Sequence, residues 1–148
     1  MENPRELFQV MTRRFGFLNK NCCQIGDTEL SIVQSHIIYE ILKKDTPSMQ
    51  QIAEILGMDI TTFSRQIQTL VKMELVSKTP LPRDRRVYQL SLTAQGNYVA
   101  AKIDAEMNQY LTEVFSHMSD SERDMVISAI KLLNEAMSKS TVCCKPLS

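Results

Sequence analysis

The chain has 148 residues, of which 43% are hydrophobic, and its 17 basic side chains are balanced by 17 acidic ones. This length and apolar content predict a single domain, large enough to bury a core. No window approaches the ~18 apolar residues of a membrane span, and the pair Arg13-Arg14 lacks the apolar run of an export signal, so we expect a soluble, cytoplasmic protein without a membrane partner.

The first predicted helix begins at Pro4. Its apolar residues recur at spacings of three and four, so the helix needs a partner; they are Phe8, Met11, Phe15, Leu18 and Cys22. A second helix is expected over residues 29–44, capped by Asp27 or Thr28, and its inward side chains are Val33, Ile37 and Ile41. The lone His36 on this helix is interpreted as a packed or hydrogen-bonded side chain, not as a metal ligand.

The next two helices form a helix-turn-helix. Ser48 and Gln51 make a capping box for the first of them, whose apolar stripe is Met49, Ile52, Ala53 and Leu56. Gly57 supplies the positive φ that ends this helix, and Asp59 can cap the second helix, which extends over about residues 60–75. So short a connection holds two helices at a steep angle.

The second helix of this pair has one apolar and one polar face. The apolar residues recur at helical spacing and are Ile60, Phe63, Ile67, Leu70 and Val71. The opposite face presents Thr61, Thr62, Arg65, Gln68, Thr69 and Lys72. Arginine can bind guanine, glutamine can bind adenine, and threonine and lysine can hold phosphates, so this face suits the major groove of DNA. Taken alone, a polar helix face of this kind is more often simply a solvated surface.

A hairpin follows and favours the DNA-binding interpretation. Residues 76–79 and 87–92 alternate with a period of two, so they pair as strands around a loop over residues 81–86. The tip carries Arg83, Arg85 and Arg86, with Asp84 placed to orient one of them, and it suits a minor groove or its phosphates. Residues 61–92 hold 6 basic and 2 acidic side chains, so positive charge gathers on this winged motif although the whole chain is neutral.

After the wing, Thr93 is expected to cap a helix running to about His117, and Ser119 with Glu122 forms a capping box for the last helix. The last helix has an apolar arc too wide for one neighbour: Met125, Val126, Ala129, Ile130, Leu132, Leu133, Ala136 and Met137. A second subunit would cover it if the first and last helices interlock across a two-fold axis. The predicted fold is therefore mainly α, with a winged helix-turn-helix over residues 29–92 and an intertwined dimerisation region over residues 1–28 and 93–148.

The run DRRVYQLSLTAQG, residues 84–96, closely resembles the wing signature of the MarR family of bacterial transcription regulators, and TTFSRQIQTLVKMELV resembles its recognition helix. The resemblance covers nearly the whole chain and implies an obligate homodimer that binds a double-stranded, pseudo-palindromic operator and is released by a small effector. By position it assigns DNA contacts to Thr61, Thr62, Ser64, Arg65, Gln68, Asp84 and Arg86; Ser48 is a further candidate. Glu74 stands where the family usually has glycine, which leaves the end of the recognition helix open.

Four cysteines form two adjacent pairs, Cys22-Cys23 at the predicted end of the first helix and Cys143-Cys144 in the tail. Three interpretations are open: a thiophilic metal or metalloid effector such as arsenite or antimonite, a thiol oxidation switch, or no sensory role. The family resemblance also implies an apolar pocket between the dimer helices and the winged domain, where a lipophilic or phenolic effector could bind instead. In each case we expect a repressor that the effector releases from DNA.

Other classes of function are less well supported. The chain has no Cys-x-x-Cys, phosphate loop, paired-histidine motif or Gly-x-Ser-x-Gly elbow, so we expect neither an enzyme nor a required cofactor. A winged helix can also act as a protein-interaction module without binding DNA. Salt dependence separates the two possibilities, because binding to DNA weakens steeply as ionic strength rises.

Overall fold

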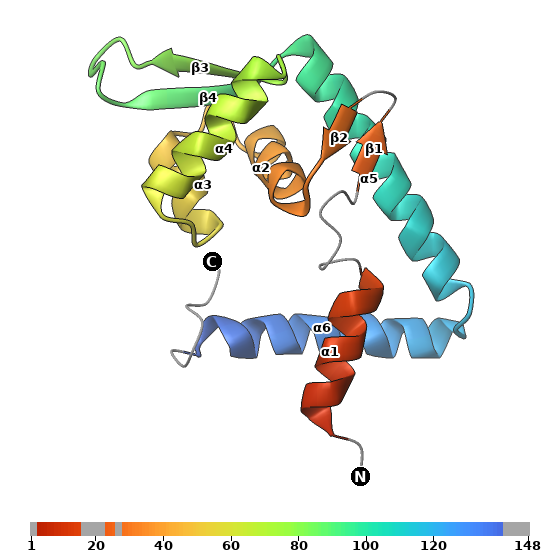
Figure 1. The fold of residues 1–148 in the computed structure, drawn as a ribbon. Coiled ribbons are helices and arrows are strands. Elements are labelled where there is room, and N and C mark those ends of the chain that lie inside the picture. The colour runs from red at the N-terminus through yellow and green to blue at the C-terminus, as the bar shows by residue number, and fades with distance from the viewer. Residues whose placement is uncertain (1–2, 16–22, 26–27, 141–148) are drawn as a thin grey trace.

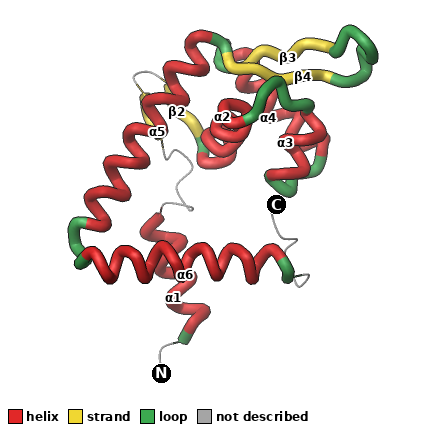
Figure 2. Tube along the Cα trace, turned by 180° about the vertical axis from the view of Figure 1, so that it is seen from behind, coloured by secondary structure: helices red, strands yellow, loops and turns green. Residues whose placement is uncertain are grey.

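The computed structural model describes residues 3–15, 23–25 and 28–140. In chain order its elements are α1 (Pro4–Phe15), β1 (Cys23–Ile25), β2 (Thr28–Leu30), α2 (Ile32–Lys43), α3 (Met49–Ile55), α4 (Ile60–Lys72), β3 (Val76–Pro80), β4 (Tyr88–Leu92), α5 (Ala94–Phe115) and α6 (Asp120–Ser138). Two parts are visible in Figure 1: a head formed by α2–α4 with the β3–β4 hairpin, and a distal part with α1 and α6 at the far end of α5. Figure 2, seen from behind, likewise shows the hairpin and α6 at opposite ends of α5.

Among the described residues, the hydrophobic core is formed by the head, by Leu30 of β2 and by the start of α5. Its largest fully buried side chains are Phe63, Leu30, Ile37, Ile38, Ile52, Ile67, Leu70, Leu75, Leu90 and Val99. Neither α1 nor α6 contributes a buried residue. The predicted winged helix-turn-helix is therefore confirmed, and within the described residues no helix is long and apolar enough to cross a membrane.

The start of α2 differs from the prediction. Residues 28–30 pair with residues 23–25 as a short antiparallel hairpin, so neither Asp27 nor Thr28 caps the helix. Ser31 does so: its hydroxyl accepts from the backbone N–H of Gln34, and the Gln34 side chain accepts from the N–H of Ser31. Val33, in the first turn of α2, was predicted to point inward but is 42% exposed, because it lies beyond the edge of the core.

Ile37 and Ile41 of α2 are buried as predicted, and Ile38 joins them. The side chain of His36 is exposed, so the interpretation as a packed histidine is wrong. It lies on the face of α2 that is turned away from the core.

The helix-turn-helix forms as predicted in its caps and its turn. Ser48 and Gln51 make the capping box of α3, Gly57 has φ 65°, and the Asp59 side chain caps α4. Within α4, Phe63, Ile67 and Leu70 are buried, but two residues predicted to be inward are not: Ile60 is 48% and Val71 38% exposed. Ile60 opens the first turn, and Val71 is rotated by about 100° from Leu70, so both lie at the border of the buried face.

The end of α4, which the sequence leaves open, is closed by Glu74 in the left-handed region with φ 63°. The N–H of Glu74 donates to the carbonyl oxygen of Val71 at 3.0 Å, and the N–H of Leu75 donates to that of Leu70 at 3.0 Å. These two bonds are a Schellman motif, which usually has glycine at the left-handed position. The recognition helix therefore ends at Lys72, before the predicted limit near residue 75.

The wing is an antiparallel pair in which Val76 lies opposite Leu92 and Pro80 opposite Tyr88. Its inner strand is tied to the head, because the N–H of Leu90 donates to the carbonyl oxygen of Pro47 at 2.8 Å. Leu90 itself is fully buried. One strand is thus fixed on the core while the loop at the tip projects beyond it (Figure 1).

Helix α5 joins the head to α6. Its cap is Thr93, as predicted, and a Cβ atom on Gly96 would collide with the carbonyl oxygen of Leu75. The glycine therefore lets α5 begin in close contact with the chain that leads from α4 into β3. The predicted capping box of α6, Ser119 with Glu122, is also present.

Candidate functional site

The outward face of α4 gathers most of the predicted DNA contacts. Phe63, Ile67 and Leu70 anchor the helix from the other side, and this orientation leaves Thr61, Thr62, Arg65, Gln68, Thr69 and Lys72 exposed. Ser64 is half-buried. In the part of the chain that the structure describes, neither Arg65 nor Lys72 forms an ion pair within 4.0 Å. Their charges are therefore available to an external anion.

Two threonines on this face already donate their hydroxyl hydrogens within the protein. Thr62 Oγ1 donates to Asp59 Oδ2 at 2.7 Å, and Thr69 Oγ1 donates to the carbonyl oxygen of Arg65 at 3.2 Å. A hydroxyl engaged in this way can still accept a hydrogen bond, and its methyl group remains exposed, but it cannot donate to a phosphate. Because of its bond to Asp59, Thr62 can contact DNA only through its methyl group or as a hydrogen-bond acceptor. This bond was not anticipated from the sequence.

The carboxylate of Asp59 is the second partner in this cap. Its Oδ1 accepts from the backbone N–H of Thr62 at 2.9 Å. The backbone bond from Thr62, followed by its hydroxyl bond, lowers the pKa of Asp59 below its ordinary value. The first turn of α4 is thereby held by an ionised cap.

The wing tip holds one of its arginines in a fixed orientation. Asp84 Oδ1 accepts from the backbone N–H of Arg86 and from its Nε, each at 3.1 Å, while Oδ2 lies 3.5 Å from Nη2. The Arg86 side chain, by its hydrogen bond, lowers the pKa of Asp84. Arg83 and Arg85 are exposed, and no described carboxylate pairs with either. The tip thus presents two unpaired cations beside one oriented guanidinium.

A contact between the wing strands was missed by the sequence reasoning. The Nζ of Lys78 lies 4.2 Å from the centre of the Tyr88 ring. Because Lys78 is opposite Leu90 and Pro80 is opposite Tyr88, the two side chains are diagonal neighbours on one face of the hairpin. The register of the two strands would have revealed this pair, but the register depends on where the loop ends, which the sequence does not define. The contact stiffens the strands that carry the tip.

Ser48 has a structural use besides its predicted DNA contact. Its hydroxyl oxygen accepts from the backbone N–H of Gln51 at 3.1 Å, and the residue forms an isolated bridge with Gln89 of β4. Ser48 therefore links the start of α3 to the wing. Its hydroxyl hydrogen is not used in the cap, so a role at DNA remains a prediction.

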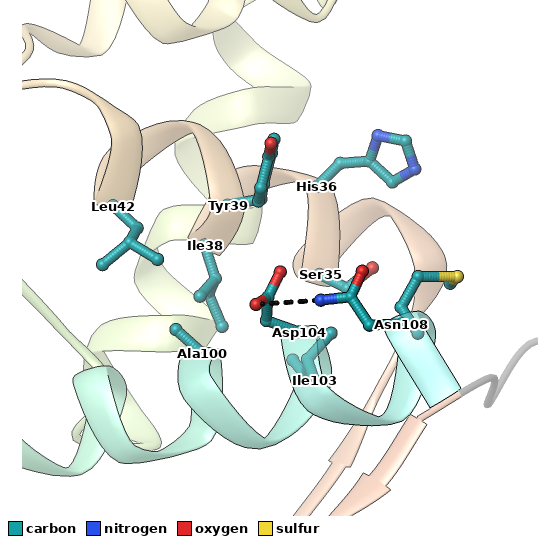
Figure 3. Close-up of a pocket in the computed structure, with 10 residues that line it drawn as sticks. Ser35, His36, Ile38, Tyr39, Leu42, Ala100, Ile103, Asp104 and Asn108 are labelled. Carbon is teal, nitrogen blue, oxygen red and sulfur yellow. Dashed lines mark hydrogen bonds between the residues drawn. The ribbon is translucent and has the colours of Figure 1, made fainter. Parts of the chain in front are cut away.

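A second candidate site is a cavity of about 300 Å³ between α2 and α5. Figure 3 shows its lining residues, which are Ser35, His36, Ile38, Tyr39, Leu42, Ala100, Ile103, Asp104, Met107 and Asn108. Ile38 and Ala100 belong to the core and form an apolar floor. The Asp104 carboxylate points from α5 toward α2, whereas the His36 ring points away from the cavity (Figure 3). The volume is at the lower end of the range for small-molecule sites.

The cysteine hypothesis falls largely outside the described residues, because these do not include Cys22, Cys143 or Cys144. Cys23 opens β1, so the prediction that it ends the first helix is wrong. No group of three or more His, Cys, Asp or Glu side chains that could hold a metal occurs among residues 3–15, 23–25 and 28–140. Metal or redox sensing by the cysteines therefore stays a prediction.

Comparisons with known proteins agree with this geometry. The model of the MarR family matches residues 30–88. An uncharacterized HTH-type transcriptional regulator, YxaD of Bacillus subtilis (strain 168), is 25% identical over 140 residues, which is 91% of this chain and 96% of YxaD.

Among solved structures, Streptococcus pneumoniae FabT in complex with DNA superimposes with TM-score 0.76 at 18% identity, covering 92% of this chain and 98% of FabT. The PcaV transcriptional regulator from Streptomyces coelicolor, in complex with its natural ligand, gives TM-score 0.71 at 18% identity, with 90% and 93% covered. At these identities the two likenesses show a shared fold.

Proposed function

Since the chain carries a MarR family domain over residues 30–88, we propose that the protein is a homodimeric repressor that binds a pseudo-palindromic operator and is released by a small effector. The observation that carries the proposal is a recognition helix with an exposed polar face, next to a wing tip whose arginines are exposed. Members of this family regulate transcription and are not enzymes. These surfaces fit double-stranded DNA, which we propose the protein binds in the cytoplasm.

Each part of the surface has its own role in this proposal. Arg65 and Gln68 read base edges in the major groove, where each good bidentate contact is worth ~1 to 3 kcal/mol of discrimination. Lys72 holds a phosphate at the end of the helix. The contacts that fix position come from Ser48, Thr61, Ser64 and the wing residues Arg83, Arg85 and Arg86, with Asp84 orienting Arg86. Thr62 and Thr69 contribute methyl groups and acceptor oxygens only.

A dimer is supported by the surface that the distal part leaves uncovered. Large apolar side chains of α1 and α6 are exposed, among them Leu7 at 51%, Met125 at 69% and Leu132 at 69%. The chain has 11143 Å² of accessible surface. A compact monomer of 16.9 kDa would expose about 7,700 Å², so the excess is roughly 3,400 Å². Two chains together would carry an excess of roughly 6,800 Å², which is more than the ~2,000–5,000 Å² in total that obligate dimers commonly bury, so it leaves room for a large dimer interface.

We therefore assign residues 1–28 and 93–148 to dimerisation and residues 29–92 to DNA binding. Helix α5 crosses this boundary, because its Val99 and Ala100 belong to the core of the head. A shift of α5 would consequently be transmitted to α2 and α4. This coupling gives a route from the dimer to the recognition helix.

The effector site that we favour is the cavity between α2 and α5. A small lipophilic molecule there would separate a helix of the head from the helix that leads to the dimer partner. The distance between the two recognition helices would then no longer match two half-sites about one DNA turn apart. Loss of base contacts at both half-sites would release the protein.

The paired cysteines offer a different effector, a thiophilic metal or metalloid ion, or oxidation. Replacing Cys143 and Cys144 with serine tests this directly. If arsenite, copper and peroxide release the variant and the wild type equally, the cysteines have no sensory role. The cavity would then remain as the effector site.

Fluorescence anisotropy with duplexes selected from random sequence tests DNA binding itself. Arg65→Ala should relax the base preference, whereas Arg85→Ala, which removes one phosphate contact from each of the two subunits, should weaken all duplexes alike and reduce the salt slope by about two. Arg123→Ala, at the start of α6 and far from the wing, is the matched control and should change neither (Figure 1). A protein-interaction module would show no salt-dependent preference for any duplex.

A further inference from the structure

Among the described residues, the lining of the cavity between α2 and α5 combines an apolar floor with one carboxylate, that of Asp104. Ile38 is 1% and Ala100 5% exposed, and Ile103 packs against the same core. Asp104 lies one turn after Ala100 on α5, so its carboxylate stands at the edge of this floor and points across it toward α2 (Figure 3). An apolar ring resting on the floor would have this carboxylate beside it.

The charge of this lining is one-sided. Among the described residues that line the cavity there is no lysine or arginine, and the ring of the histidine among them, His36, points away. Asp104 Oδ2 accepts one hydrogen bond, from Asn108 Nδ2 at 3.3 Å, and no cationic side chain of the described residues pairs with it. The Asn108 bond orients the carboxylate without neutralising it. Among the described lining residues an anionic ligand would find no cation to compensate this charge, whereas a cationic ligand would pair with it.

We propose that the cavity selects a cationic aromatic molecule, whose rings lie on the apolar floor and whose positive charge pairs with Asp104. This inference rests on the proposal that the cavity is the effector site, and it adds the chemical class of the effector. Lys43, whose Nζ lies 4.9 Å from the centre of the ring of the lining residue Tyr39, is paired with Glu40 at 3.4 Å and is therefore not a free counter-ion for Asp104. A volume of about 300 Å³ accommodates a bicyclic aromatic compound.

Three bicyclic aromatics of similar size and different charge test the inference: 1-methylquinolinium, 2-naphthol and 2-naphthoate. Isothermal titration calorimetry of the full chain without DNA should rank them in that order of affinity. Asp104→Asn keeps the shape of the side chain and should weaken binding of the quinolinium about fivefold while leaving 2-naphthol unchanged. Glu106→Gln removes the same charge from the opposite face of α5 and should have no effect.

The possible outcomes separate the two levels of the proposal. If naphthoate binds as tightly as the quinolinium, or if Asp104→Asn and Glu106→Gln behave alike, the charge selectivity is refuted while the cavity remains an effector site. If none of the three compounds binds to the wild type, the inference and the effector site both fail. DNA binding is measured separately with Arg65→Ala, so neither outcome affects that part of the proposed function.

Discussion

Replacing Glu74 with glycine should stabilise the protein, because this residue closes α4 in the left-handed region with φ 63°. For a residue with a Cβ atom this conformation costs roughly 1–2 kcal/mol. Glycine adopts it freely but loses about 0.5–1 kcal/mol more backbone entropy on folding. The two Schellman bonds, from Glu74 and Leu75 to the carbonyl oxygens of Val71 and Leu70, use backbone atoms only and survive the change. The expected net gain is about 0.5–1 kcal/mol.

Thermal unfolding followed by circular dichroism, at fixed protein concentration, should show the gain as a rise of about 2 °C in Tm. Glu74→Ala removes the same carboxylate but keeps a Cβ atom, so it should show no rise. Glu106→Gly, in the middle of α5, should instead destabilise by about 1 kcal/mol. Equal Tm values for Glu74→Gly and Glu74→Ala would refute the argument, because the effect would then belong to the charge and not to the backbone.

Three further changes test other parts of the structure. The pKa of Asp59 is lowered by its bonds to Thr62. Its stabilising contribution is therefore present above the unfolded pKa near 4 and is lost as pH falls through the lower folded value. Between pH 5 and pH 3, the Tm of Asp59→Asn should consequently fall by less than the Tm of the wild type. Gly96→Ala should destabilise by about 1–3 kcal/mol in urea unfolding, because its Cβ atom would collide with the carbonyl oxygen of Leu75; an unchanged midpoint would contradict this close approach. Leu132→Glu should produce folded monomers in analytical ultracentrifugation, because this exposed side chain packs only in the proposed dimer; a variant that remains dimeric would place the interface elsewhere.

Features set by neighbouring residues could be predicted from the sequence. The caps at Ser48, Asp59, Thr93 and Ser119 depend on hydrogen bonds between residues three apart, and all four are present. The same signature occurs at Ser31 and Gln34 but was not recognised, because the helix was expected to start before it. The sequence therefore contains the signal for all five caps, including the one at Ser31 that was missed.

Features set by distant residues could not be predicted in this way. The β1–β2 hairpin has strands of 3 residues each, too short to show a period of two. The exposure of Ile60 and Val71 depends on where the core ends, which spacing alone does not define. At the candidate site, spacing placed Arg65 and Gln68 on one face, but the charge of the α2–α5 cavity required the packing of two helices that are far apart in sequence.

The central claim is that two winged heads, held by one dimer, bind duplex DNA through the outward face of α4 and the wing. Anisotropy of a labelled, selected duplex, measured as a function of salt concentration, tests it most directly. The account predicts two chains per duplex and a binding constant that falls steeply as salt rises, with a slope reporting several phosphate contacts. A chain that stays monomeric and shows no preference for any duplex at low salt would contradict it.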